Sequence, residues 1–297
     1  MFNHRLRAMR REVGGVVAGD AGAVHRMRVA SRRLREALPV LDAVDEPGRP
    51  GTRSPRKVAR TVRRVTRALG RVRELDVALA LLDELERNHP RLRAATGTVR
   101  QVVGCEREIR RRAMARRVER ADLGRMHREI RARAADAAMA AAAGSWKPAL
   151  GVRIARRAAG VETAVEAAGG LYAPDRLHGV RIRAKKLRYV LELAHELGRV
   201  PALQAIRQLK QMQDVLGHMH DLEVLAGYTR LLELQASTRG RPHARIAGLL
   251  NTIEDEIRLL HAAYLEGRPV LDDVVALCRR DYCPRLGGGG TSAGPGS

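Results

Sequence analysis

Apolar residues recur every three or four positions along most of the chain, and this spacing predicts a succession of α-helices. The first helix is expected over residues 3–17, and Gly19-Asp20 should end it. Asp20 is a suitable N-cap for a second helix that runs to about Ala43 and bends at Pro39. No segment shows the sustained alternation of a β-strand, so we expect an all-α protein.

The later helices follow from the same spacing and from proline and glycine positions. Residues 91–143 are long for one globular helix, so we expect a break near Leu123-Gly124. The Gly/Ser-rich residues 287–297 should be disordered. The helices after the second are expected at about 55–88, 91–143, 147–168, 175–197, 202–235, 243–266 and 271–282.

A basic stretch of the second helix occurs twice in the chain. The copies are His25-x-x-Arg28-x-x-x-Arg32-Arg33-Leu34-Arg35 and His178-x-x-Arg181-x-x-x-Lys185-Lys186-Leu187-Arg188-Tyr189. Each residue of a helix advances by about 100°, so each copy places its basic residues on one side and its apolar residues on the other. Each helix should therefore offer one face to a core and the other to something negatively charged.

The segment after each copy is also repeated. Residues 69–77 align with residues 216–224, which lie 147 positions later, whereas His178 lies 153 positions after His25. The difference matches a longer Pro/Gly-rich loop in the first copy. We therefore expect two repeats, 1–143 and 144–286, followed by the tail 287–297. Each repeat should form a four-helix-bundle-like unit, and a pseudo-twofold axis should relate the two.

This doubled His/Arg pattern resembles the CHAD family, the conserved histidine α-helical domain, over most of the chain. The resemblance implies the same pair of helical bundles. It also implies inorganic polyphosphate as the ligand and polyphosphate granules in the cytoplasm as the location.

The basic faces of the repeated helices should border a central furrow or pore. Rows of like charge destabilise a helix unless an anion lies against them, and the planar guanidinium of arginine suits phosphate. Gln211 and Asp214 replace Arg64 and Arg67 in the second repeat, so the first repeat should dominate the positive field. Histidines on these faces would add charge below about pH 6.5. The residues expected to bind polyphosphate are His25, Arg28, Arg32, Arg35, Lys57, Arg60, Arg64, Arg67, Arg71, His178, Arg181, Lys185, Arg188, Tyr189, Arg207 and Lys210.

The overall charge agrees with a polyanionic partner. Lys and Arg total 56 against 33 Asp and Glu, which gives a net charge of +23. Aromatic residues make up only 2% of the chain, so there are few platforms on which nucleobases could stack. A polyanion without bases is favoured, and a protein that holds an RNA or DNA backbone through Arg and Lys alone is the alternative. The arginines of residues 91–135, including Arg110-Arg111-Arg112 and Arg116-Arg117, are interpreted as solvated surface.

No catalytic signature or cofactor motif is present, so we expect a non-enzymatic protein without a cofactor or a metal. Glu254-Asp255-Glu256 resembles part of a triphosphate tunnel enzyme motif, but it lies in a helical pattern rather than on a strand. A metal-dependent polyphosphate or triphosphate hydrolase that uses residues 74–76 and 218–223 remains a third possibility.

The acidic and histidine residues of those two segments have a simpler interpretation. His218 and His220 are two positions apart and do not share a helix face, so they cannot chelate one ion on a regular helix. We expect the carboxylates to pair with the arginines of the basic faces; they are Glu74, Asp76, Asp221 and Glu223.

The odd number and the wide spacing of the three cysteines, Cys105, Cys278 and Cys283, do not suggest a disulfide framework. They are interpreted as free thiols of a cytoplasmic protein. The N-terminal residues lack the apolar run of a signal peptide, and no stretch is long enough to cross a bilayer, so no membrane partner is expected.

Overall fold

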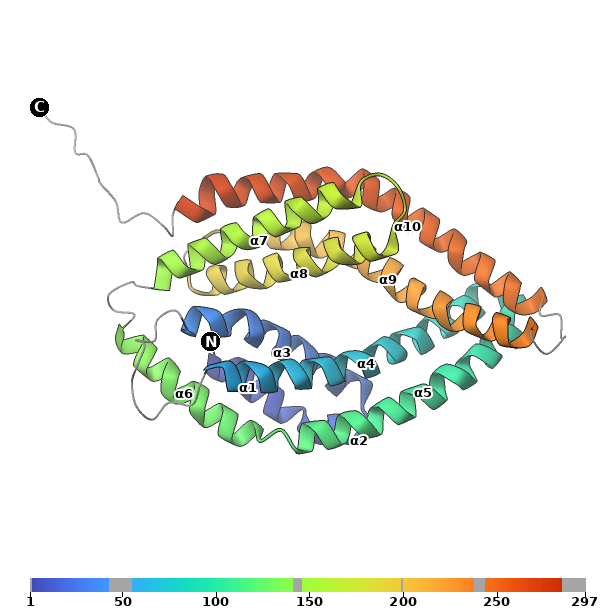
Figure 1. Cartoon of the computed structure of the whole chain (residues 1–297), viewed down its shortest axis with the longest axis horizontal. Helices are drawn as coiled ribbons and strands as arrows, with labels where there is room; N and C mark the ends of the chain where they lie inside the picture. The colour runs from blue at the N-terminus through green and yellow to red at the C-terminus, as the bar shows by residue number, and fades with distance from the viewer. Residues whose placement is uncertain (1, 43–54, 141–145, 199, 238–243, 285–297) are drawn as a thin grey trace, which may run out of the picture.

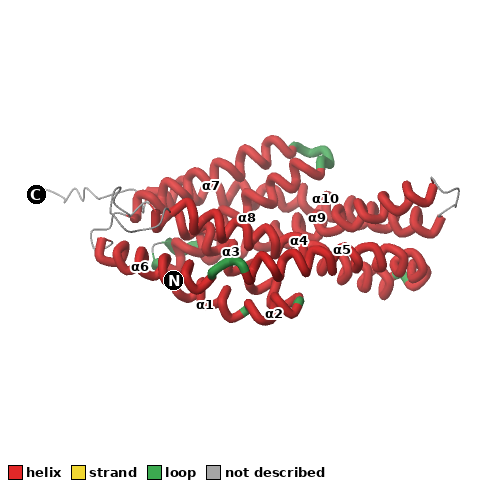
Figure 2. Tube along the Cα trace, turned by 60° about the horizontal axis from the view of Figure 1, so that its bottom comes forward, coloured by secondary structure: helices red, strands yellow, loops and turns green. Residues whose placement is uncertain are grey.

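The computed structural model describes residues 2–42, 55–140, 146–198, 200–237 and 244–284. Every regular element in these ranges is a helix, which confirms the all-α prediction (Figures 1 and 2). The helices are α1 (Phe2–Arg11), α2 (Val13–Ala18), α3 (Ala21–Asp42), α4 (Pro55–Asn88), α5 (Arg93–Glu119), α6 (Leu123–Ala140), α7 (Trp146–Ala168), α8 (Pro174–Glu196), α9 (Leu203–Ser237) and α10 (Ala244–Leu277).

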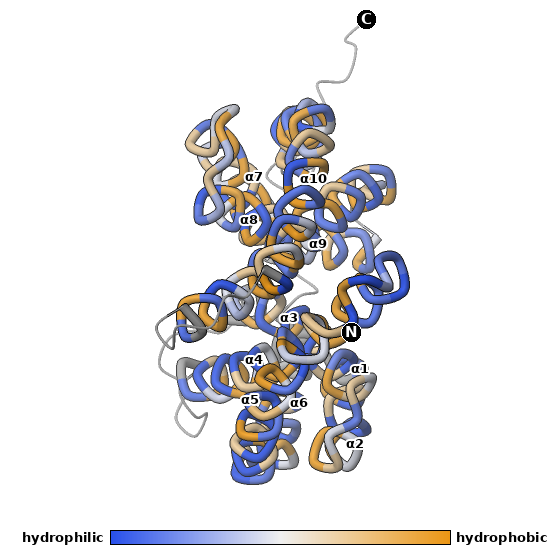
Figure 3. The backbone as a smooth tube through the Cα atoms, turned by 90° about the vertical axis from the view of Figure 1, so that its right-hand side faces the viewer, coloured by the Kyte–Doolittle hydropathy of each residue, from blue (hydrophilic) through white to orange (hydrophobic). Residues whose placement is uncertain are grey.

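The helices form two groups that follow the order of the chain. Figure 1 shows α7 to α10 above α1 to α6, with the long hairpins α4–α5 and α9–α10 meeting at the right-hand end. Contacts of α3 with α7 and α8, and of α4 with α9, join the two groups. Viewed along the long axis, each helix carries both hydrophobic and hydrophilic residues (Figure 3). None of the described helices has the length and hydrophobicity that crossing a bilayer requires.

Two of the expected chain breaks have visible causes. Gly19 ends α2 with a positive φ of 87°, and Asp20 Oδ1 then accepts a hydrogen bond from the backbone N–H of Ala23 at 2.5 Å. Asp20 therefore caps α3 as predicted. The break in residues 91–143 falls at 120–122, immediately before the predicted position, and Asp122 accepts a hydrogen bond from the N–H of Arg125 at 2.8 Å.

Two predicted helices have different bounds. The first region is two helices, α1 and α2, which meet at Glu12. The predicted break between residues 266 and 271 is wrong, because α10 continues through Pro269 and ends in a π-helical turn at Cys278–Tyr282. Proline removes one backbone donor there, but α10 packs closely along α9. A Cβ on Gly267 would come within 2.6 Å of Met212 Sδ, so the glycine permits this approach.

Among the described residues, the hydrophobic core consists of two clusters. The smaller one lies within the first half and includes Leu6, Met27, Leu69 and Ile130. The larger one combines the apolar faces of α7 to α10 with the distal parts of α4 and α5, from Leu75 to Val103. The α4–α5 hairpin therefore belongs to both clusters and holds the two halves in one packed structure. The pseudo-twofold relation between the halves stays a prediction.

Candidate anion-binding site

Helices α3 and α8 bring the two copies of the basic stretch together. Arg28 and Arg32 on α3 face Arg181 and Lys185 on α8, and all four are partly buried. Burial, and after it the Arg181, Arg32 and Arg28 guanidiniums, lower the pKa of Lys185 to about 6. Burial and then Arg32 lower the pKa of Arg28 to about 10. Because the Arg28, Arg32 and Arg181 charges all act on Lys185, the four basic residues form a common site rather than two separate helix faces.

Arg28, Arg181 and Lys185 border a cavity of about 380 Å³ between α3, α4, α8 and α9, and Arg32 lies beside it. Helix α3 contributes His25 and Arg28, and α8 contributes Arg181 and Lys185. The α4 and α9 walls carry Arg73, Glu74, Gln213, Asp214, His218, His220 and Asp221. We call this space the central cavity. The central cavity joins basic residues that lie about half the chain apart in the sequence.

Glycines on α4 and α9 make room for the arginines of the cavity. A Cβ on Gly70 would overlap the guanidinium of Arg28, which lies across α4 and donates to the backbone carbonyl of Thr66 at 3.5 Å. Gly217 occupies the corresponding position of the second repeat, and its Cβ would be 3.8 Å from Arg181 Nε. The first repeat is therefore packed more tightly than the second at this point.

Each repeat pairs its cavity arginine with one carboxylate. Arg28 Nη2 lies 3.6 Å from Glu74 Oε1, and Arg181 Nη2 lies 3.8 Å from Asp221 Oδ1. These pairs confirm the prediction that Glu74 and Asp221 serve the arginines of the basic faces. No carboxylate within the described ranges lies within 4.0 Å of Arg32 or Lys185. Arg32, beside the cavity, therefore carries a positive charge that the described carboxylates do not pair, and Lys185 adds a second when it is protonated.

The other two predicted acidic partners, Asp76 and Glu223, do not pair with the arginines of the basic faces. Asp76 is buried and accepts a hydrogen bond from Arg107 Nε of α5 at 2.6 Å. Glu223 accepts the hydroxyl of Tyr172 at 2.8 Å and lies 3.7 Å from His220. Among the described residues, no group of three His, Cys, Asp or Glu side chains is placed to hold a metal ion.

The two histidines of the repeat have different surroundings. Burial, and then the Arg73 and Arg28 charges, lower the pKa of His25. His178 lies deeper, and its Nδ1 is 3.2 Å from Nδ1 of His220, so one nitrogen donates and the other accepts. Burial and then His220 lower the pKa of His178. Both histidines therefore become charged at a lower pH than the value of about 6.5 expected from the sequence.

Buried ion pairs fix the angle at which α3 meets α7 and α8. Glu36 accepts from Arg153 Nη2 at 2.7 Å and from Arg157 Nη2 at 2.9 Å, and its side chain is only 7% exposed. On α8, Glu192 accepts from Arg33 Nε at 2.8 Å. Because a buried carboxylate needs such partners, these contacts hold the two basic helices in register.

Several predicted binding residues lie beside the cavity rather than in its wall. Arg35 stands near Glu36 and Arg63, and Arg188 stands 3.7 Å from Glu192. Tyr189 is only 4% exposed and belongs to the core, with the Arg188 guanidinium 5.1 Å from its ring centre.

The predicted basic face of α4 does not line the central cavity. Its five members are exposed, and three of them border a separate groove with α5; the five are Lys57, Arg60, Arg64, Arg67 and Arg71. Arg73 lines the cavity instead, and Arg63 faces the end of α3 near Arg35. Arg207 and Lys210 of α9 are likewise exposed and are not among the lining residues.

The reason for this difference is the position of α3 relative to α4. The sequence pattern predicts a binding face opposite the apolar stripe, but α3 packs on the flank that carries Thr66 and Gly70. Residues two positions apart on a helix point in nearly opposite directions, so Arg73 faces the cavity when Arg71 faces α5. In the alignment of the two repeats, Arg73 corresponds to His220. This match of two basic residues is the sequence signal that could have identified Arg73 as a cavity residue.

Comparisons with known proteins agree with this architecture. A sequence model of the CHAD domain matches residues 1–230. The crystal structure of the CHAD domain from the plant Ricinus communis is similar, with a TM-score of 0.61 and 23% sequence identity. The alignment covers 94% of this chain and 89% of that chain, and at this identity it shows a shared fold. No curated protein sequence matches the chain. Because the family model covers well over half of its residues, the chain belongs to the CHAD domain family.

Proposed function

We propose that the chain binds inorganic polyphosphate in the central cavity and catalyses no reaction on it. The observation that carries this proposal is that Arg28 and Arg181, one from each repeat, line one half-buried cavity, while Arg32 beside it pairs with no described carboxylate. Buried charge without a counter-ion is costly. A phosphate chain in the cavity would supply that counter-ion.

The chemistry of the walls favours phosphate over nucleobases. The cavity is lined by arginine, lysine and histidine, and none of its lining residues is Phe, Tyr or Trp. Arginine donates paired hydrogen bonds to phosphate oxygens, and each charge-assisted bond contributes about 1.5–3 kcal/mol. These contributions do not add to an affinity, because ordering and desolvation of the phosphate chain oppose them.

An extended ligand suits the space better than a single phosphate. A second cavity of about 560 Å³ between α1 and α3 shares His25 and Val29 with the central cavity. Its walls add Arg5, Arg11 and Arg33. A linear anion could therefore pass from one space to the other along α3, with His25 at the junction. On this proposal, polyphosphate granules of the cytoplasm are the expected location.

The test compares polyphosphate with duplex DNA of equal charge at physiological salt. We expect tighter binding of polyphosphate, and we expect the double variant Arg32→Ala and Lys185→Met to weaken it strongly. Equal affinity for the two polymers would instead favour the alternative, a protein that binds nucleic-acid backbones. Unchanged binding by the double variant would show that the central cavity is not the site.

A further inference from the structure

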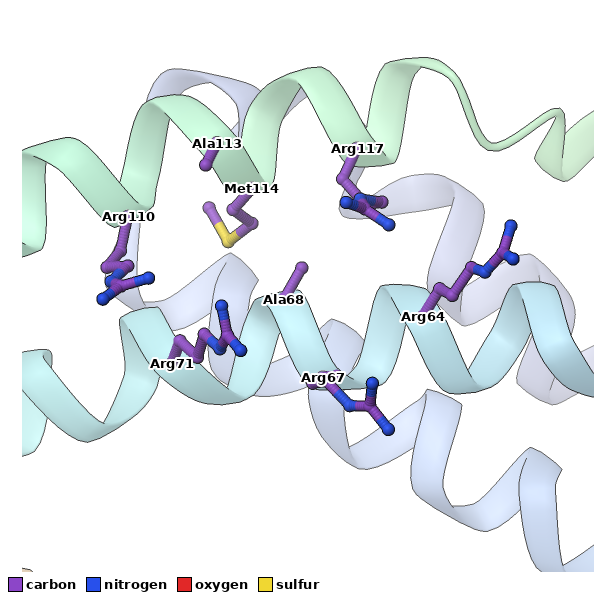
Figure 4. Close-up of a pocket in the computed structure, with 8 residues that line it drawn as sticks. All are labelled: Arg64, Arg67, Ala68, Arg71, Arg110, Ala113, Met114 and Arg117. Atoms are coloured by element: carbon purple, nitrogen blue, oxygen red, sulfur yellow. The ribbon is translucent and has the colours of Figure 1, made fainter.

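A second concentration of positive charge lies in a groove between α4 and α5 (Figure 4). The groove encloses about 200 Å³, and its floor is formed by Ala68, Ala113 and Met114. Five arginines border it, namely Arg64, Arg67, Arg71, Arg110 and Arg117. The two α5 members belong to the region that the sequence suggested is only solvated surface.

These arginines are paired less than their neighbours on α5. Arg107 and Arg111 form ion pairs with carboxylates at 2.6 and 2.8 Å. Arg110 has one partner, Glu106, at 2.6 Å. No carboxylate of the described ranges lies within 4.0 Å of the other four groove arginines, Arg64, Arg67, Arg71 and Arg117. The groove therefore collects like charges that repel one another in the free protein.

The arginines form two opposed pairs along the groove. Figure 4 shows Arg110 across from Arg71 and Arg117 across from Arg64, while Arg67 lies toward the outer edge. Each helix spaces its two members by seven residues, which corresponds to about 10.5 Å along the axis. A single phosphate cannot reach both pairs at once, whereas an elongated anion can.

We propose that this α4–α5 groove is a second binding site for a linear oligophosphate, separate from the central cavity. The floor is narrow and apolar, and no Phe, Tyr or Trp lines it, so the groove offers guanidiniums but no stacking platform for bases. Arg71 faces this groove and Arg73 faces the central cavity, so α4 separates the two sites.

Two sites on opposite sides of one helix have a functional consequence. One molecule can hold two phosphate segments, and on long polymers it can therefore join two chains. The identity of the ligand rests on the function proposed above, whereas the existence of the groove site does not. The experiment must therefore address the two sites independently.

The experiment is calorimetric titration of the full chain with a short linear polyphosphate of defined length. The groove variant combines Arg64→Glu with Arg117→Glu, and the cavity variant combines Arg32→Ala with Lys185→Met. We expect two equivalents to bind the wild type and one to bind either variant. Binding at the reversed groove should weaken by about 100-fold, since two charge-assisted contacts at about tenfold each are lost.

The matched control is Arg116→Glu, which reverses an exposed charge next to Arg117 outside the groove. It should bind two equivalents, and circular dichroism should show that all variants remain helical. A groove variant that titrates like the Arg116→Glu control would overturn the second site. The groove proposal also fails if the groove variant loses binding of duplex DNA but still binds two equivalents of oligophosphate. It fails likewise if inorganic phosphate competes for the groove as well as the oligophosphate does. Retention of both equivalents by the cavity variant would refute the central site alone, and absence of binding to the wild type would refute both.

Discussion

The guanidinium of Arg28 lies directly over Gly70 of α4, in the space that a Cβ on residue 70 would occupy. This contact places Arg28 between Thr66 and Glu74, at the wall of the central cavity. The equivalent glycine of the second repeat, Gly217, leaves 3.8 Å between an added Cβ and Arg181. Two related positions in one chain therefore differ in how much room the arginine leaves.

The alanine substitutions at these two glycines should have different consequences for binding. Gly70→Ala should displace Arg28 and weaken polyphosphate binding, whereas Gly217→Ala should leave binding unchanged. Alanine is favoured over glycine in a helix by about 1 kcal/mol, so Gly217→Ala should also raise the Tm. Titration calorimetry and thermal unfolding of both variants measure these effects. Equal binding by the two variants would mean that the position of Arg28 does not matter.

Polyphosphate binding should be coupled to proton uptake by Lys185. The pKa of this amine is about 6 in the free protein, so the amine is largely neutral above pH 7. A bound anion favours the charged form and raises the pKa. Affinity should therefore fall as the pH rises above 6. Titrations in buffers of different ionisation enthalpy measure the protons taken up.

The matched variant for this coupling is Lys185→Met, since histidines can also take up protons. His25 and His178 remain in the variant, so the difference from the wild type isolates the lysine. We expect a smaller proton uptake in Lys185→Met. An identical uptake in both proteins would assign the coupling to the histidines instead.

The same lysine should make the free protein less stable near pH 6 than at alkaline pH. Its pKa is lowered on folding, so the unfolded chain binds more protons between about pH 6 and the ordinary lysine range. The free energy of unfolding should therefore rise with pH across that window, by at most about 1.4 kcal/mol per pH unit from this group. Below pH 6 the amine is charged in both states and the dependence ends.

Lys185→Met should remove this pH dependence and raise the free energy of unfolding near pH 7. Methionine fills a similar volume without a charge to desolvate. Urea unfolding at several pH values compares the two proteins. A variant that is less stable than the wild type near pH 7 would show that the lysine is satisfied in the folded state.

Glu36 should be among the carboxylates on which stability depends most. Neutralising it as Glu36→Gln leaves Arg153 and Arg157 charged and half-buried without their carboxylate. Breaking a buried ion pair typically costs about 3–5 kcal/mol. Chemical unfolding should show a loss of this size.

The control for Glu36 is Glu162→Gln, which removes the partner of the exposed Arg279. An exposed ion pair contributes about 0–1 kcal/mol, so the control should be nearly neutral. Similar losses in the two variants would contradict the structural role assigned to Glu36.

The amino-acid pattern was enough to predict the helices, the doubled His/Arg stretch and the basic residues of α3 and α8. The helical spacing of apolar residues and the cap at Asp20 are local properties, so they could be read without a structure. The sequence also predicts that the basic residues lie on the helix faces away from the apolar stripes; they are Arg28, Arg32, Arg181 and Lys185. Of the four carboxylates predicted to pair with the arginines of the basic faces, Glu74 and Asp221 do so.

The flank of α4 that borders the cavity could not be predicted, because it depends on how the helices pack. Periodicity identifies the buried side of a helix, but the flanks are assigned by the neighbouring helices. Thus Arg73 entered the cavity wall and Arg71 joined Arg110 in the outer groove. The low pKa of Lys185 also arises from burial beside Arg181, Arg32 and Arg28, two of which come from the other half of the chain. Such shifts depend on distances in space, which the order of residues along the chain does not contain.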